Sequence, residues 1–289
     1  MPRARPALLL LLPICFGACS TPKPTAPSNA PETSTRSLLE DRLLSVLELE
    51  QDLDAAAAKE DPEIGQIQRQ FHGVAAAYRD LLAFNPDSLE TRLLYGKLLS
   101  RYGDRDGARD QFLAAARIDP RVAVIHQQLA TYYAEEADHT RALAFMLNAV
   151  ELEPQTAAYH FGLGQLLLAF REPFVEEGIY SRPQLETEML NAFRTAATLS
   201  PLETALQFRF GEAAYDVAQP DWSATLAHWI DIENRLALDP LQHDALHVHV
   251  ARCLIALERL DEARQRLTLV TSPTLQPSAQ ALLEIISHD

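Results

Sequence analysis

From residue 37 onward, apolar residues follow a helical pattern with few interruptions, so the sequence predicts a succession of amphipathic helices. Alanine and leucine dominate and glycine is scarce, with 10 residues, which favours helix over sheet. Dipeptides that end in proline interrupt the pattern and mark where a helix stops and a turn begins. These prolines are Pro86, Pro120, Pro154, Pro201 and Pro240.

The first three of these prolines are spaced 34 residues apart, and the residues between them repeat in kind. In residues 87–120 the repeated positions hold Tyr95-Gly96, Leu99, Ala108, Phe112, Ala115 and Pro120. In residues 121–154 the same offsets hold Leu129-Ala130, Tyr133, Ala142, Met146, Ala149 and Pro154. Antiparallel helices approach closely only where small residues meet, and the proline ends the second helix. Each unit is therefore predicted to be one helix pair.

This spacing resembles the tetratricopeptide repeat (TPR), whose pattern alternates small and large residues at fixed offsets and ends on proline. The resemblance implies an all-α fold, a right-handed α-solenoid of helix pairs over residues 37–289. It is clearest in 87–120 and 121–154. The tryptophan usual at position 4 of the repeat is replaced in successive units by Arg92, His126, His160 and Gln207.

The other units fit with changes. The third carries 13 extra residues around 171–183, between its two helices. The fourth is degenerate, because Arg235 stands where alanine is expected. Residues 278–287 are predicted to form a closing helix, and residues 37–58 and 63–84 an irregular pair at the start.

Residues 1–18 have the three parts of an export signal: a short basic region, an apolar run of ten residues and a small-residue site. The following Cys19 completes the tetrapeptide FGAC, which resembles the bacterial lipobox, although Phe16 stands where leucine is usual. The resemblance implies that the signal is removed and that Cys19 is lipidated. Residues 19–36 are rich in proline, serine and threonine, and are predicted to be a flexible linker behind the lipid. The alternative is an ordinary signal peptide with incidental cysteines.

A lipidated Cys19 followed by Ser20 implies delivery to the outer membrane of a Gram-negative bacterium, facing the periplasm. Acylation at that position leaves Cys253 as the one remaining cysteine of the mature chain, and its apolar helical neighbours predict a packed core residue. The formal net charge of −15 argues against a nucleic-acid partner, because phosphate binding needs clustered Lys and Arg.

Three histidines, His243, His247 and His249, raise the possibility of a metal site, since positions four apart share a helix face. However, His249 is predicted to point elsewhere, and no obvious carboxylate or thiol completes a shell. The sequence also lacks the common catalytic motifs. We therefore expect no metal, no cofactor and no enzymatic activity. A metal-binding or enzymatic protein that uses these histidines is the less favoured alternative.

In the TPR family, first-helix positions line a concave groove that receives peptides or helices. The residues mapped onto those positions are Lys97, Arg101, Gln127, Thr131, Phe161, Gln165, Phe208, Glu212, Val248 and Arg252. Phe161 and Phe208 are predicted either to anchor a partner or to turn into the core. Inserted loops of repeats often carry function. Within the insertion, the predicted exposed contacts are Phe174, Ile179 and Tyr180, and the alternative is that they pack onto their own repeat.

Together these patterns predict a membrane-anchored, non-catalytic scaffold that holds a protein or peptide partner in the bacterial envelope. The chain looks like the class that includes type IV pilus pilotins, the repeat lipoprotein of the β-barrel assembly machine and adaptors for peptidoglycan hydrolases. Nothing in the sequence chooses among these processes. A soluble periplasmic or secreted binder without lipid is the alternative.

Overall fold

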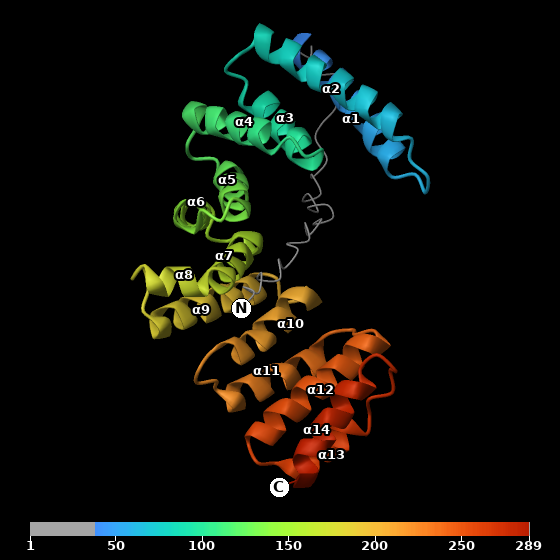
Figure 1. Ribbon diagram of the computed structural model, residues 1–289, viewed down its shortest axis with the longest axis vertical. Helices are drawn as coiled ribbons and strands as arrows, with labels where there is room; N and C mark the ends of the chain where they lie inside the picture. The colour runs from blue at the N-terminus through green and yellow to red at the C-terminus, as the bar shows by residue number, and fades with distance from the viewer. Residues whose placement is uncertain (1–37, 289) are drawn as a thin grey trace, which may run out of the picture.

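The computed structural model describes residues 38–288, and helix is the regular secondary structure throughout that range (Figure 1). The chain begins with α1 (Leu38–Ala57), α2 (Ile64–Phe84), α3 (Leu89–Arg101), α4 (Arg105–Ile118), α5 (Ala123–Glu135) and α6 (His139–Leu152). It continues with α7 (Ala157–Ala169), α8 (Arg171–Glu176), α9 (Arg182–Leu199), α10 (Thr204–Glu212) and the short 3₁₀ helix η1 (Ala213–Asp216). It ends with α11 (Trp222–Arg235), α12 (Pro240–Ala256), α13 (Leu260–Leu267) and α14 (Gln276–His288).

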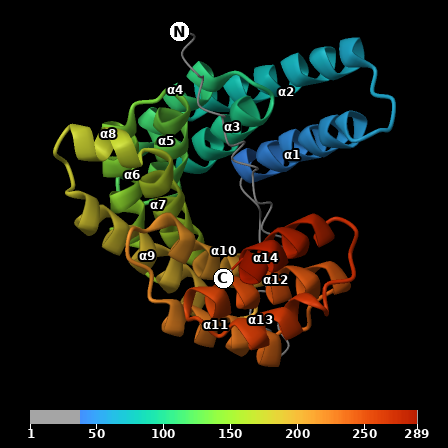
Figure 2. The ribbon, with the colours of Figure 1, turned by 60° about the horizontal axis from the view of Figure 1, so that its bottom comes forward.

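Consecutive helices pack as pairs, and the pairs stack side by side. The closest partners are α1 with α2, α3 with α4, α5 with α6, α7 with α9, and α12 with α13. The stacked pairs form an arc, with the first helix of each pair toward the inside and the second toward the outside (Figure 2). The predicted all-α solenoid of helix pairs is confirmed.

The small residues of the repeat make close helix packing possible. A Cβ atom added to Gly96 on α3 would lie 2.7 Å from the ring of Phe112 on α4. A Cβ atom on Gly164 of α7 would lie 2.7 Å from the ring of Phe193 on α9. The small residue on the first helix therefore receives the aromatic ring of the second, which accounts for the pairing of these two offsets.

An aspartate begins the second helix in several pairs. Asp104 accepts a hydrogen bond from the backbone N–H of Gly107 at 3.0 Å, and Asp138 accepts one from Arg141 at 3.0 Å. Asp221 does the same for α11, accepting from Ala224 at 2.9 Å. Each side chain satisfies a helix N–H that has no partner within the helix, which stabilises the helix start by about 1 kcal/mol.

Most of the clustered buried side chains belong to two large clusters, and Ala123, Ala149 and Tyr159 form a small third one. The larger of the two extends from α1 to α9 and includes Ala213 of η1, and the other spans α11 to α14. Helix α10 contributes to both, because Phe210 packs against the larger cluster and Phe208 against the smaller. Helix α10 therefore joins the two halves of the core.

Of the two alternatives for the insertion, exposed contacts or packing onto the protein, the structure supports packing at Phe174. Residues 171–183 form α8, a turn over residues 177–181 and the start of α9, and Phe174 on α8 is fully buried. Its ring lies 5.3 Å from the ring of His139 and 6.2 Å from that of Tyr180. The prediction that Phe174 is an exposed contact is therefore wrong, because α8 turns its apolar side onto the core. Tyr180 is half-buried against Phe174, and Ile179 is 39% exposed.

The predicted signal peptide (1–18) and the predicted lipidated Cys19 with its linker (19–36) lie outside the described residues. Within residues 38–288, no helix is both long enough and apolar enough to cross a membrane.

Candidate partner-binding face

The predicted groove residues lie on the first helices of the pairs, which line the inside of the arc (Figure 2). We call this set the inner face: Lys97, Arg101, Gln127, Thr131, Phe161, Gln165, Phe208, Glu212 and Arg252. Val248, mapped to the same positions, is 4% exposed and belongs to the core. The others are at least partly exposed.

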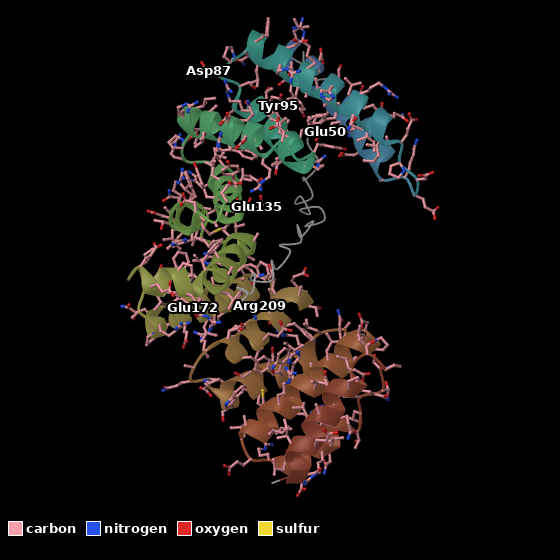
Figure 3. The ribbon with its side chains drawn as sticks, in the orientation of Figure 1. Glu50, Asp87, Tyr95, Glu135, Glu172 and Arg209 are labelled. Carbon is pink, nitrogen blue, oxygen red and sulfur yellow. The ribbon has the colours of Figure 1, made fainter. Side chains whose placement is uncertain are left out.

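Arg101 on α3 is occupied by contacts within the chain. Its guanidinium forms ion pairs with Glu50 at 3.1 Å and with Asp54, both on α1 (Glu50 is labelled in Figure 3). Glu50 also accepts a hydrogen bond from the Tyr78 hydroxyl at 2.6 Å, and Asp54 accepts one from the Tyr102 hydroxyl at 2.8 Å. This polar network ties α1 and α2 to the end of α3. Arg101 therefore stabilises the first helix pair.

Burial is the main reason why the two tyrosines of this network have raised pKa values. Burial, reinforced by the hydrogen bond to Glu50, raises the pKa of Tyr78. Burial and the hydrogen bond to Asp54 raise the pKa of Tyr102 to about 12. Both hydroxyls remain protonated donors near neutral pH, so the two carboxylates keep their hydrogen bonds.

Amide and hydroxyl groups occupy the middle of the inner face. On α5 the side-chain amide of Gln127 donates to the Thr131 hydroxyl at 3.3 Å and accepts from Gln128 at 2.7 Å. On α7 the side-chain oxygen Oε1 of Gln165 accepts a hydrogen bond from the Arg209 guanidinium at 3.4 Å. Within residues 38–288 no hydrogen bond engages the Gln165 NH₂ group. Such groups are able to bind the backbone of an extended peptide.

Phe161 and Phe208 each pack against the core and stay partly exposed. The ring of Phe161 meets that of Phe193 edge-on, with centroids 5.9 Å apart. The ring of Phe208 meets Trp229 in the same way at 5.2 Å. Core packing therefore accounts for one side of each ring, and contact of the exposed side with a partner stays a prediction.

An aromatic cluster next to Glu212 was not expected from the sequence. The imidazole of His249 on α12 stacks on the Trp229 ring of α11, with centroids 4.4 Å apart and planes within 4°. The His249 Nδ1 atom is at hydrogen-bond distance from the Tyr215 hydroxyl, 2.9 Å away, and its Nε2 atom is 3.7 Å from a Glu212 carboxylate oxygen. Burial, and then the nearby charge of Arg252, lowers the pKa of His249 to about 4. The imidazole is therefore neutral at pH 7.

The remaining histidines have other neighbours. His247 lies 4.0 Å from the Glu233 carboxylate, and Arg266 forms an ion pair with the same carboxylate. His249 is committed to the aromatic cluster. Among the described residues, no group of three or more His, Cys, Asp or Glu side chains has an arrangement suited to a metal ion.

Cys253 is fully buried, and burial raises its pKa to about 12.

A hollow of about 900 Å³ lies between α11 and α13, with α12 as its floor. Its apolar lining comes from Leu226, Ile230 and Leu254, and its charged rim includes Arg259 and Arg266. Both arginines are already paired with carboxylates, Glu262 and Glu233 respectively. Neither arginine of the hollow is therefore left unpaired to attract a negatively charged ligand.

No protein-family model matches the chain, and no curated protein matches it. Solved structures do resemble it. The chain is similar to YrrB, described as a TPR protein with an unusual peptide-binding site, with a TM-score of 0.57 and 16% identity over 73% of this chain and 98% of that one. It is also similar to PilF of Pseudomonas aeruginosa, with a TM-score of 0.54 and 13% identity over 86% of this chain and 100% of that one. At these identities the likeness shows the fold alone, an α-solenoid of helix pairs.

Proposed function

We propose that this protein is a non-catalytic scaffold whose inner face holds an extended segment of a partner protein. The observation that carries the proposal is the row of polar side chains on adjacent first helices, Gln127 and Thr131 on α5 and Gln165 on α7. Phe161, whose ring is partly exposed, lies one helical turn before Gln165 on α7. Amides satisfy the backbone of an extended chain, and an aromatic ring offers an apolar anchor.

The solved structures favour the same reading by analogy. YrrB has the same kind of fold and is described as having a peptide-binding site. That description belongs to YrrB, and its transfer to this chain rests on fold-level analogy. The amide row of this chain supplies the independent support.

We also propose that the protein is attached to the outer membrane by a lipid on Cys19 and works in the periplasm on a partner of the cell envelope. The support comes from the sequence alone, namely the short apolar run, the FGAC tetrapeptide and the proline-rich residues that follow. The same binder without a lipid is the second candidate.

Capture from envelope extracts tests the binding face. The full chain and its Gln127→Ala and Gln165→Ala variants are used as bait, with Gln265→Ala as the matched control, because Gln265 is exposed on α13, a second helix on the outside of the arc. We expect a partner that is retained by the control and lost or reduced with both inner-face variants. A partner retained equally by all the variants would show that it binds elsewhere.

Membrane attachment is tested separately by labelled palmitate and cell fractionation. We expect label in the wild type, no label in Cys19→Ala, and a shift of that variant to the soluble fraction. Label that survives the substitution, or wild-type protein that is wholly soluble, would contradict lipidation at Cys19.

A further inference from the structure

Toward its C-terminal end the inner face changes character. Phe208 and Glu212 on α10, Tyr215 on η1, and His249 and Arg252 on α12 come together in a single cluster, which we call the α10–α12 site. Phe208 and Tyr215 are half-buried, and the Glu212 side chain is 41% exposed. A ligand can therefore reach both the rings and the carboxylate.

Within residues 38–288 no arginine or lysine forms an ion pair with Glu212, although the charges of Arg209 and Arg252 act on its carboxylate from beyond 4.0 Å. Among the described residues, the one basic group within 4.0 Å of its carboxylate is His249, at 3.7 Å, and that imidazole is neutral at pH 7. The neighbouring acid differs, since Asp216 is paired with Arg209 at 2.8 Å. Partial burial raises the pKa of Glu212, which shows that its charged form is incompletely solvated. An added cation would stabilise that charge.

The rings beside Glu212 can accept a guanidinium. The Arg252 guanidinium already lies over the Tyr215 ring, with its carbon 5.6 Å from the ring centroid. Within residues 38–288 no carboxylate is within 4.0 Å of Arg252, so this contact does not depend on an ion pair. A planar guanidinium both stacks on an aromatic ring and pairs with a carboxylate, which an ammonium does less well.

We infer that the α10–α12 site binds an arginine side chain of the partner segment, with Glu212 as the counter-ion and the rings of Phe208 and Tyr215 as the surrounding wall. The inference rests on the proposed function, because it assumes that the segment lies along the inner face. The chain's net charge of −15 also favours association with a basic segment.

Arg252 has a defined part in this site. It is an exposed cation near Glu212 and its positive charge opposes the approach of a second one. Removal of the Glu212 charge should therefore weaken arginine binding, whereas removal of the Arg252 charge should strengthen it. A residue that merely supports the fold would not produce this opposite pair of effects.

The test is selection of random dodecapeptides, displayed with blocked termini, on the immobilised full chain. We expect the recovered peptides to be enriched in arginine, more than in lysine. One arginine-containing peptide is then titrated against the variants, with circular dichroism to confirm that each is folded. Binding should fall roughly fivefold or more with Glu212→Gln and rise with Arg252→Gln.

Glu203→Gln at the start of α10 and Arg117→Gln on α4 are the matched controls, since both side chains are exposed and lie outside the α10–α12 site. The arginine site would be contradicted if the peptides were not enriched in arginine, or if Glu212→Gln left binding unchanged. Neither result would contradict peptide binding by the inner face. Recovery of no peptide at all would contradict the proposed function as well.

Discussion

The Arg101 guanidinium on α3 lies 3.1 Å from the Glu50 carboxylate on α1, across 51 residues of sequence. The Glu50 side chain is 11% exposed, so it depends on Arg101 and Tyr78 for its hydrogen bonds. The first helix is thus held to the repeats by a partly buried polar network as well as by apolar packing.

Removal of this ion pair should loosen the first helix pair. Arg101→Ala leaves the Glu50 charge nearly buried without a cation, and we expect the free energy of unfolding to fall by about 1–2 kcal/mol. Urea denaturation measures the change, with Arg117→Ala on the exposed side of α4 as the control. Equal stability of the two variants would mean that the network contributes nothing.

Close packing at the small-residue positions makes a second prediction. Gly96→Ala would place a methyl group 2.7 Å from the Phe112 ring, and we expect a loss of about 1–3 kcal/mol because the ring must move. Gly73→Ala on α2 meets nothing within 4 Å, so it should instead stabilise the helix by about 0.5–1 kcal/mol. Thermal unfolding of both variants measures these changes. If Gly73→Ala destabilised the protein as much as Gly96→Ala, close packing against Phe112 would not be the cause.

The turns between paired helices hold a left-handed residue. Ala137 has φ of 58° and Gly103 has φ of 89° at the corresponding turns of neighbouring units. Ala137→Gly should therefore raise the free energy of unfolding by about 0.5–1 kcal/mol, and Gly103→Ala should lower it by a similar amount. Chemical denaturation of this pair should give opposite signs, and the same sign in both would show that backbone strain does not govern the turn.

His249 gives the fold a dependence on pH. Its pKa falls from 6.5 to about 4 on folding, so the unfolded chain binds the proton more readily between these values. Stability is then lost as pH falls from about 7 toward 4, by at most about 3 kcal/mol from this residue. His249→Phe should flatten this part of the pH profile while the carboxylate effects common to both proteins remain. Superimposable profiles for the two proteins, measured by urea denaturation, would exclude this role for His249.

The sequence predicted the regular part of the fold because its packing rule is local. Small and aromatic residues at matching offsets, such as Gly96 with Phe112, reappear as direct contacts between paired helices. The same rule explains why the degenerate fourth unit still forms a pair, since Gly211 faces the Trp229 ring. Helix pairing therefore follows from residues within one repeat.

The candidate site was less predictable because it depends on contacts between units. The partners of Arg101 lie on α1, which precedes the regular repeats. Phe174 lies in the insertion, where the repeat pattern does not indicate which positions are buried. The contact between Tyr215 and His249 depends on η1, which directly follows α10 in the degenerate unit. None of these relationships leaves a periodic signal in the sequence.

Site-specific photo-crosslinking in cells tests the central claim most directly. A photoreactive amino acid replaces Gln127 on the inner face or Gln265 on α13, on the outside of the arc, in the full chain. We expect a discrete crosslinked partner at Gln127 and none at Gln265. Crosslinks at Gln265 alone, or none at Gln127 in cells that express the protein normally, would contradict a scaffold that binds through its inner face.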